Sequence, residues 1–156
     1  MRAVIHPGRA CGTVAAPPSK SMAHRFLILA GLSAGTSAVH PVDPSEDILA
    51  TLDCLRALGA AAAWEGGAVR VTGIDPAAAV PAALPCRESA STLRFMIPLC
   101  LLSGRPMLLT GSEGLMRRPL SAYEALCREK GFRFARQGEG LAVEGRLTPG
   151  VYTVPG

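Results

Sequence analysis

The sequence predicts an α/β (α+β) protein made of two similar units in tandem. Segments of the same pattern recur 70–72 residues apart along the chain. Each unit contains one apolar helical segment and one amphipathic segment, and each ends in a glycine turn between alternating residues, which is typical of a β-hairpin. We therefore expect the order strand, helix, strand, helix, hairpin (βαβαββ) in both units.

The elements follow in order along the chain. We expect a strand segment at 1–15, then a first unit at 16–74 with helices at 19–33 and 45–58 and a strand at 37–42 between them. Residues 75–83 contain two prolines and read as a linker. The second unit, 84–148, repeats the pattern with helices at 89–103 and 118–130 and a strand at 107–110. Three glycine pairs keep an offset of 72: Gly59 and Gly131, Gly66 and Gly138, and Gly73 and Gly145.

The two helices of a unit differ in polarity. Helix 19–33 has no charge after Arg25, and helix 89–103 has none after Arg94, so we expect both to be buried. Helices 45–58 and 118–130 carry charges along one side, which we expect to face water. Pro98 should kink its helix, because the carbonyl of Arg94 loses its donor.

Composition narrows the class of protein. The chain has 156 residues, of which 49% are hydrophobic and 18% charged, and this excludes a disordered chain. Its longest apolar stretches fall far short of the ~20 residues that span a bilayer. The first residues do not resemble a signal peptide, so we expect a soluble cytoplasmic protein with no membrane partner. Five widely spaced cysteines without a CxxC motif indicate neither a metal site nor a disulfide framework.

A net charge of +4 favours an anionic partner. Aromatic residues, which stack on bases, make up only 4% of the chain, and the longest basic run is Arg117-Arg118. Small phosphorylated or carboxylated ligands are therefore favoured over nucleic acid.

Three candidate anion sites lie at helix starts, where free N–H groups attract anions. Lys20, Ser21 and Arg25 open the first apolar helix, with Arg25 one turn after Ser21. Ala90 and Ser91 open the second, with Arg94 in its first turns, at the equivalent place in the repeat. In the third, Pro119 suits the first turn of a helix and holds Arg118 extended at its mouth. Each also has a bland interpretation, as ordinary caps and solvated cations, but together they indicate a cleft for more than one anion.

Three segments carry a resemblance to a known family: SKSMAHRFLILAGLSAGTS, RESASTLRFMIPLCLLSG and LTGSEGLMRRPLSAYEALCREKG. In this order they resemble the 3-phosphoshikimate 1-carboxyvinyltransferases (EPSP synthases), over nearly the whole chain. The resemblance implies a fold of six βαβαββ units in two domains. The chain would then be an N-terminal portion with two of those units, and 149–156 would be a truncated connection to a third.

The family transfers the enolpyruvyl group of phosphoenolpyruvate to the 5-hydroxyl of shikimate 3-phosphate and releases phosphate, in aromatic amino-acid biosynthesis. No cofactor or metal is implied. By resemblance, Lys20, Ser21 and Arg25 bind shikimate 3-phosphate. Lys20, the amides near Ala90 and the side chain of Arg118 bind phosphoenolpyruvate, while Ser91 and Arg94 support them.

Two departures from the family pattern matter. Ala90 stands where Gly is usual, and we expect its methyl group to crowd glyphosate more than phosphoenolpyruvate. The family's acid/base carboxylate and lysines lie in parts that this chain lacks. No catalytic residue is therefore assigned here, and we expect the isolated chain to need the C-terminal part and to form no product.

Two other functions remain open. One is a relative of UDP-N-acetylglucosamine 1-carboxyvinyltransferase, which Lys20, Ser21 and Arg25 disfavour because they suit a phosphate better than a nucleotide sugar. The other is a non-catalytic anion- or RNA-binding module, since small βαβαββ units also occur in such proteins.

Overall fold

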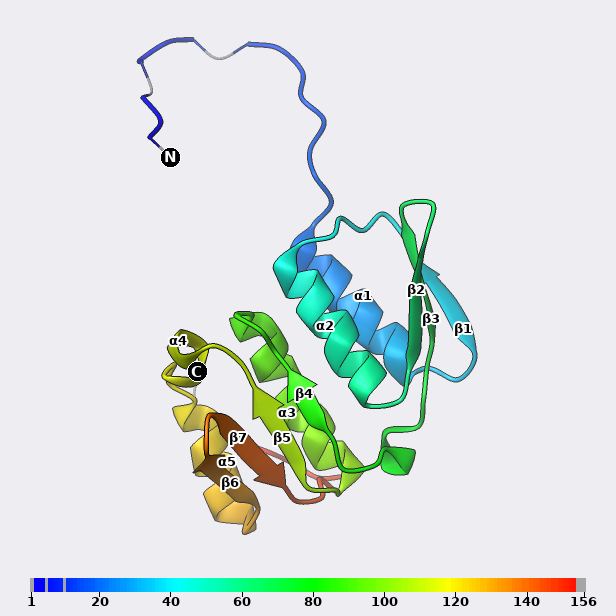
Figure 1. The fold of residues 1–156 in the computed structure, drawn as a ribbon, viewed down its shortest axis with the longest axis vertical. Coiled ribbons are helices and arrows are strands. Elements are labelled where there is room, and N and C mark those ends of the chain that lie inside the picture. Colours follow the sequence, from blue (N-terminus) through cyan, green and yellow to red (C-terminus); the bar gives the residue numbers. More distant parts are fainter. Residues whose placement is uncertain (1, 5, 10, 154–156) are drawn as a thin grey trace.

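The computed structural model describes residues 2–4, 6–9 and 11–153 as two successive units of sheet and helices (Figure 1). The elements of the first unit are α1 (Lys20–Leu32), β1 (Thr36–Val39), α2 (Glu46–Ala57), β2 (Ala61–Glu65) and β3 (Ala68–Thr72). A short 3-10 helix, η1 (Pro76–Ala78), lies in the connection. The second unit contains β4 (Ala83–Pro85), α3 (Ala90–Ser103), β5 (Met107–Thr110), α4 (Glu113–Met116), α5 (Ser121–Lys130), β6 (Arg133–Gln137) and β7 (Gly140–Glu144).

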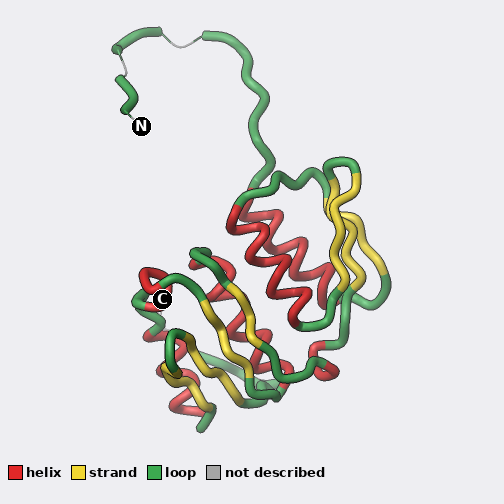
Figure 2. The backbone as a smooth tube through the Cα atoms, viewed as in Figure 1, coloured by secondary structure: helices red, strands yellow, loops and turns green. Residues whose placement is uncertain are grey.

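The three strands of the first sheet have counterparts in the second, which has one further strand, β4 (Figure 2). The first sheet has the strand order β1-β3-β2 and the second the order β4-β5-β7-β6. The hairpins β2–β3 and β6–β7 begin 72 residues apart, at Ala61 and Arg133. In the second unit β4 and β5 pair in parallel and α3 makes the crossover between them. The predicted α/β class with repeated strand and helix elements is therefore confirmed.

The N-terminal segment differs from the expected strand. Residues 2–4, 6–9 and 11–15 contain no strand and run as an extended arm away from the helices and sheets (Figures 1 and 2). A strand is stabilised by the edge of a sheet beside it. No described strand lies beside the arm, so in the described residues the first unit begins with α1.

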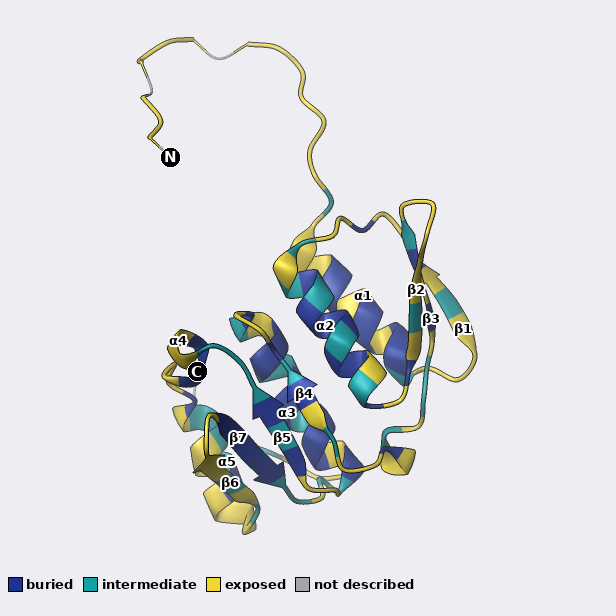
Figure 3. Ribbon diagram, in the orientation of Figure 1, coloured by how far each residue is buried: buried dark blue, intermediate teal, exposed yellow. Residues whose placement is uncertain are grey.

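The two units share a core around α3 (Figure 3). Leu93, Met96 and Ile97 of α3 are fully buried, and their cluster includes Cys54 of α2 and Leu58, the residue that follows α2. α1 is less buried than its apolar sequence predicts. Met22, Phe26 and Leu29, which follow one another on a single face, are 47%, 48% and 59% exposed. Because about half of each of these residues is exposed, the prediction of complete burial was wrong for α1.

The charged side of α2 does more than face water. Glu46 and Asp53 accept hydrogen bonds from Arg87 of the second unit, at 2.7 Å and 2.6 Å, and Asp47 pairs with Lys20. Arg87 holds these contacts with a φ of 52°, in the left-handed region. The acidic residues of α2 therefore tie it to α1 and to the segment before α3.

Pro98 does not interrupt α3, which continues to Ser103. The carbonyl that Pro98 deprives of a donor, that of Arg94, accepts a hydrogen bond of 3.1 Å from the hydroxyl of Tyr123 on α5. In this way α5 is attached to the first turns of α3.

Four cysteines are buried, and Cys54, Cys100 and Cys127 are core residues as predicted. No helix in residues 2–4, 6–9 and 11–153 combines the length and the apolar character that crossing a membrane requires.

Candidate functional site at the helix starts

The amino-terminal ends of α1, α2 and α3 lie at the same end of the molecule (Figure 1). Side chains join them directly. Lys20, the first residue of α1, pairs with Asp47 of α2. The hydroxyl of Thr92 on α3 donates to the backbone carbonyl of Asp47, at 3.3 Å. The positive ends of three helix dipoles therefore converge.

At the start of α1, Ser19 caps the helix by accepting a hydrogen bond from the N–H of Met22, at 3.4 Å. Lys20 and Ser21 are the first two helical residues, so their N–H groups have no acceptor within the helix. The hydrogen bond from Lys20 lowers the pKa of Asp47, which keeps that carboxylate ionised. Asp47 holds the ammonium group of Lys20 in place without covering it, because the lysine side chain is 53% exposed.

Arg25 extends from α1 toward α3. Its Nη1 donates to the carbonyl of Ser21 at 2.6 Å, and its guanidinium carbon lies 5.4 Å from the ring centroid of Phe95. This is the distance of a cation–π contact. The first predicted site is thus in contact with the helix that carries the second.

At the start of α3, the hydroxyl of Ser89 caps the helix by accepting from the N–H of Thr92, at 3.2 Å. Ala90 and Ser91 are the first two helical residues, so their N–H groups also have no partner within the helix. Ala90 is half-buried and Ser91 is exposed. This geometry can receive a phosphate or carboxylate oxygen.

Arg94 connects the start of α3 to the third predicted site, the turn that contains Arg118. Its Nη1 donates to the carbonyl of Ala90 at 3.3 Å and its Nη2 to the carbonyl of Pro119 at 3.5 Å. The side chain thereby joins the start of α3 to the turn that carries Arg118. Arg118 is exposed in that turn, and in the part of the chain that the structure describes no contact links its side chain to α1.

The helix expected at 118–130 begins later, at Ser121, and the short helix α4 before it was not predicted. Arg117 pairs with Glu113 of α4, one turn earlier. Arg117 and Arg118, adjacent in sequence, therefore have different surroundings.

Several residues that build the site were not singled out from the sequence: Asp47, Thr51, Thr92, Phe95 and Tyr123. From the sequence, Asp47 was grouped with the water-facing charges of its helix. In the structure it pairs with Lys20, which is 27 residues away in the sequence. No local pattern reports such a pairing. The one available signal was Pro98, which implies that some distant donor must satisfy the carbonyl of Arg94.

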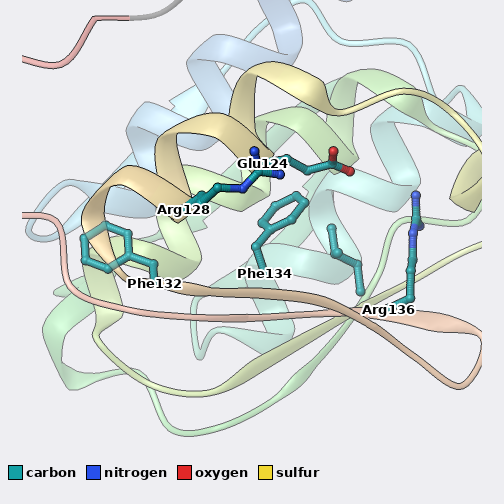
Figure 4. A pocket seen from close by; sticks show the side chains of 6 residues that line it. Glu124, Arg128, Phe132, Phe134 and Arg136 are labelled. Carbon is teal, nitrogen blue, oxygen red and sulfur yellow. The ribbon is translucent and has the colours of Figure 1, made fainter.

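Hollows in the described residues lie elsewhere, and two of them are beside α5 and α4. One, of about 360 Å³, is lined by Glu124 and Arg128 of α5, which lie over Phe134, and by Phe132, Arg136 and Leu141 (Figure 4). Another, of about 630 Å³, lies beside α4 and the turn of the last hairpin. Neither is lined by Lys20, Arg25 or Ala90. Among the described residues, no three His, Cys, Asp or Glu side chains gather closely enough to hold a metal ion.

Comparison with known proteins gives a consistent result. The chain is 35% identical over 158 residues to a 3-phosphoshikimate 1-carboxyvinyltransferase of Clostridium perfringens, and the match covers 99% of this chain and 37% of the relative. A Clostridium botulinum enzyme of the same name is 36% identical, again over 37% of its length. The chain thus spans little more than a third of these relatives.

The solved structure of EPSP synthase from Acinetobacter baumannii superposes with a TM-score of 0.75, over 86% of this chain and 32% of that one. At 24% identity this likeness concerns the fold. The sequence model of the family described as EPSP synthase (3-phosphoshikimate 1-carboxyvinyltransferase) matches residues 4–141. Since that match includes the starts of α1 and α3 and the turn of Arg118, the chain belongs to the EPSP synthase family.

Proposed function

We propose that this chain forms the part of an enolpyruvyl transferase that binds the anionic groups of both substrates. The reaction joins the enolpyruvyl group of phosphoenolpyruvate to the 5-hydroxyl of shikimate 3-phosphate and releases phosphate. Lys20, Ser21 and Arg25 bind the phosphate of shikimate 3-phosphate. Phosphoenolpyruvate is bound by Lys20, Arg118 and the N–H groups at Ala90, with Ser91 and Arg94 in support.

The observation that supports this most directly is the contact of Arg25 with Phe95, 5.4 Å from guanidinium to ring. It brings a cation of α1 against the first turns of α3, so two anion sites become neighbours. Arg94 connects these two sites to the turn that contains Arg118, because its side chain donates to the carbonyls of both Ala90 and Pro119. Membership of the EPSP synthase family then suggests which two anionic ligands bind there, phosphoenolpyruvate and shikimate 3-phosphate.

The physical task of these residues is to hold two anions close together. Phosphoenolpyruvate and shikimate 3-phosphate repel each other, and fixed cations with oriented N–H groups offset that repulsion. They also orient the attacking hydroxyl toward the enol carbon. The residues that exchange protons belong to the part of the enzyme outside the match. On this proposal the 156-residue chain alone binds substrates weakly and forms no product.

A chemical-shift titration of the isotope-labelled chain tests the proposal. Shikimate 3-phosphate should shift the amide signals of Lys20, Ser21 and Arg25, and phosphoenolpyruvate those of Ala90 and Ser91. Arg25→Ala should abolish the response to shikimate 3-phosphate. Arg105→Ala, the same charge change beyond the opposite end of α3, is the matched control and should leave the response intact.

Two further titrants separate the other functions. An equal response to UDP-N-acetylglucosamine at the same residues would favour the amino-sugar transferase. Salt-sensitive binding of RNA, with no response to shikimate 3-phosphate, would favour a non-catalytic module.

A further inference from the structure

A chain of buried hydrogen bonds connects α1, α2 and α3 just below their starts. Nδ1 of His24 on α1 lies 2.8 Å from the hydroxyl of Thr51 on α2, which lies 2.8 Å from the hydroxyl of Thr92 on α3. The hydroxyl of Thr92 in turn lies 2.8 Å from that of Ser89, the cap of α3. All four side chains are at least 98% buried.

The donors of this chain can be ordered. Nε2 of His24 is buried without a hydrogen-bond partner among the described residues. A buried N–H without an acceptor costs about 1–3 kcal/mol, so the proton belongs on Nδ1, which has Thr51 as acceptor. Thr51 then donates to Thr92, and the one proton of Thr92 has two acceptors within reach, the hydroxyl of Ser89 at 2.8 Å and the carbonyl of Asp47 at 3.3 Å. The order of donors therefore runs from α1 through α2 to α3.

We infer that Thr51 is a positioning residue, whose hydroxyl fixes the start of α1 relative to the start of α3. The inference rests on the proposed function, in which those two starts bind the two substrates. Thr51 belongs to neither helix, yet its hydroxyl bonds to both. His24 lies one turn after Lys20, and Thr92 lies two residues after Ala90.

Hydrogen bonds fix this geometry in a way that apolar packing does not. Leucine side chains at a helix contact can slide past one another with little loss, but a slide or rotation of α3 would break the hydrogen bond from Thr51 to Thr92 and leave the buried hydroxyl of Thr51 without that acceptor. Unsatisfied buried groups are costly, so the chain allows one register. A displacement of about 1 Å at either start is enough to misplace the N–H groups that meet an anion.

The test compares two substitutions of Thr51 in the 156-residue chain. Thr51→Val keeps the shape and removes the hydroxyl, whereas Thr51→Ser keeps the hydroxyl and removes a methyl group. Thr36→Val is the matched control, because it removes a Thr–Thr hydrogen bond of 2.9 Å, between Thr36 and Thr72, that lies within one sheet. Thr92→Val removes the same hydrogen bond from the side of α3. It is the substitute variant if Thr51→Val does not fold.

Two readouts report on position rather than on stability. Residual dipolar couplings measure the orientation of α1 relative to α3, and the ¹⁵N shifts of the His24 ring report which nitrogen carries the proton. Thr51→Val should change both, while Thr51→Ser and Thr36→Val should leave them as in the parent chain. Thr51→Val should also weaken phosphoenolpyruvate and shikimate 3-phosphate binding by about tenfold.

The outcomes separate the two claims. Unchanged couplings and unchanged affinities in Thr51→Val would overturn the positioning role while leaving the proposed function intact. If the parent chain binds neither substrate, the proposed function fails, and the dipolar couplings alone then decide whether Thr51 fixes the helices. A change equal in Thr51→Val and Thr51→Ser would also overturn the inference, since the hydroxyl would then be irrelevant.

Discussion

The hydroxyl of Tyr123 donates a hydrogen bond of 3.1 Å to the backbone carbonyl of Arg94. Pro98, four residues further along α3, has no N–H to offer that carbonyl. A side chain of α5 thus completes the hydrogen bonding of α3. The side chain of Arg94 also donates to the carbonyl of Pro119, in the turn that contains Arg118. α3 is therefore joined both to α5 and to the turn that precedes it.

Removal of this hydroxyl should destabilise the protein. We expect Tyr123→Phe to lower the free energy of unfolding by about 1 kcal/mol, because the carbonyl of Arg94 is left without a donor. Urea denaturation followed by circular dichroism measures the loss. The Pro98→Ala background is the control, since it restores an N–H to the same carbonyl and should make Tyr123→Phe nearly neutral. An equal cost in both backgrounds would refute this account.

Arg87 gives a prediction about backbone conformation. Arg87→Ala and Arg87→Gly both remove the ion pairs with Glu46 and Asp53, but only glycine adopts a φ of 52° without strain. We therefore expect Arg87→Gly to be the more stable of the two variants, by about 1 kcal/mol. Thermal unfolding of both variants tests this, and an order in which alanine is the more stable contradicts it.

The pairing of Asp47 with Lys20 predicts a dependence on pH. The hydrogen bond from Lys20 holds the pKa of Asp47 below its ordinary value of 3.8, so its stabilising effect is present above pH 3.8 and is lost as the pH falls further. Asp47→Asn should cost about 0.5 kcal/mol at pH 7, because the pair is partly exposed to solvent. The difference from the parent chain should shrink below pH 3.8. Glu139→Gln, in an exposed hairpin turn, is the control and should show no such convergence.

His24 should titrate at a lower pH than a free histidine. Burial lowers its pKa from 6.5, so the unfolded chain binds the proton more readily than the folded one. Stability should therefore decrease as the pH falls below 6.5, by at most about 1.4 kcal/mol per pH unit from this group. An NMR titration of the ring protons gives the midpoint directly. A midpoint at or above 6.5 would show that the ring is not buried as described.

Ala90 bears on inhibitor selectivity within the proposed function. In a complete enzyme that contains this chain, Ala90→Gly should strengthen inhibition by glyphosate by about tenfold, since it removes a methyl group from the pocket. The KM for phosphoenolpyruvate should change much less. Ala125→Gly, on the exposed side of α5, controls for the general cost of glycine in a helix. Equal inhibition of the parent and Ala90→Gly enzymes would show that the methyl group of Ala90 does not affect glyphosate binding.

Local patterns of the sequence were sufficient to predict the four longer helices and the two hairpins, but not the short helix α4. The apolar segment 19–33 became α1 at Lys20–Leu32, and the strand at 107–110 was located to the residue. The glycine at each hairpin turn and the periodicity of each helix act within a few residues, so they can be read without the fold. Where a strand was expected at 1–15, residues 2–4, 6–9 and 11–15 form none, since a strand also needs a neighbouring strand, which a local pattern does not reveal.

The contacts that assemble the site were beyond the sequence. Thr51 and Thr92 are 41 residues apart, and their meeting depends on how three helices pack. A threonine within a helix has many ordinary explanations, so neither residue stood out. Lys20, Arg25 and Ala90 could be proposed from the sequence because capping residues, cations and free N–H groups are local properties of a helix start.

The distribution of the cysteines makes the protein convenient to label. Cys11 lies exposed on the extended arm, whereas the four other thiols are buried in the core. Burial raises the pKa of Cys100 and Cys127, and contact with the thiol of Cys86 does so for Cys54, so few thiolates form there at neutral pH. A maleimide dye or surface linker would therefore attach to the native protein at one place, on the arm that precedes α1, with no cysteine replaced beforehand.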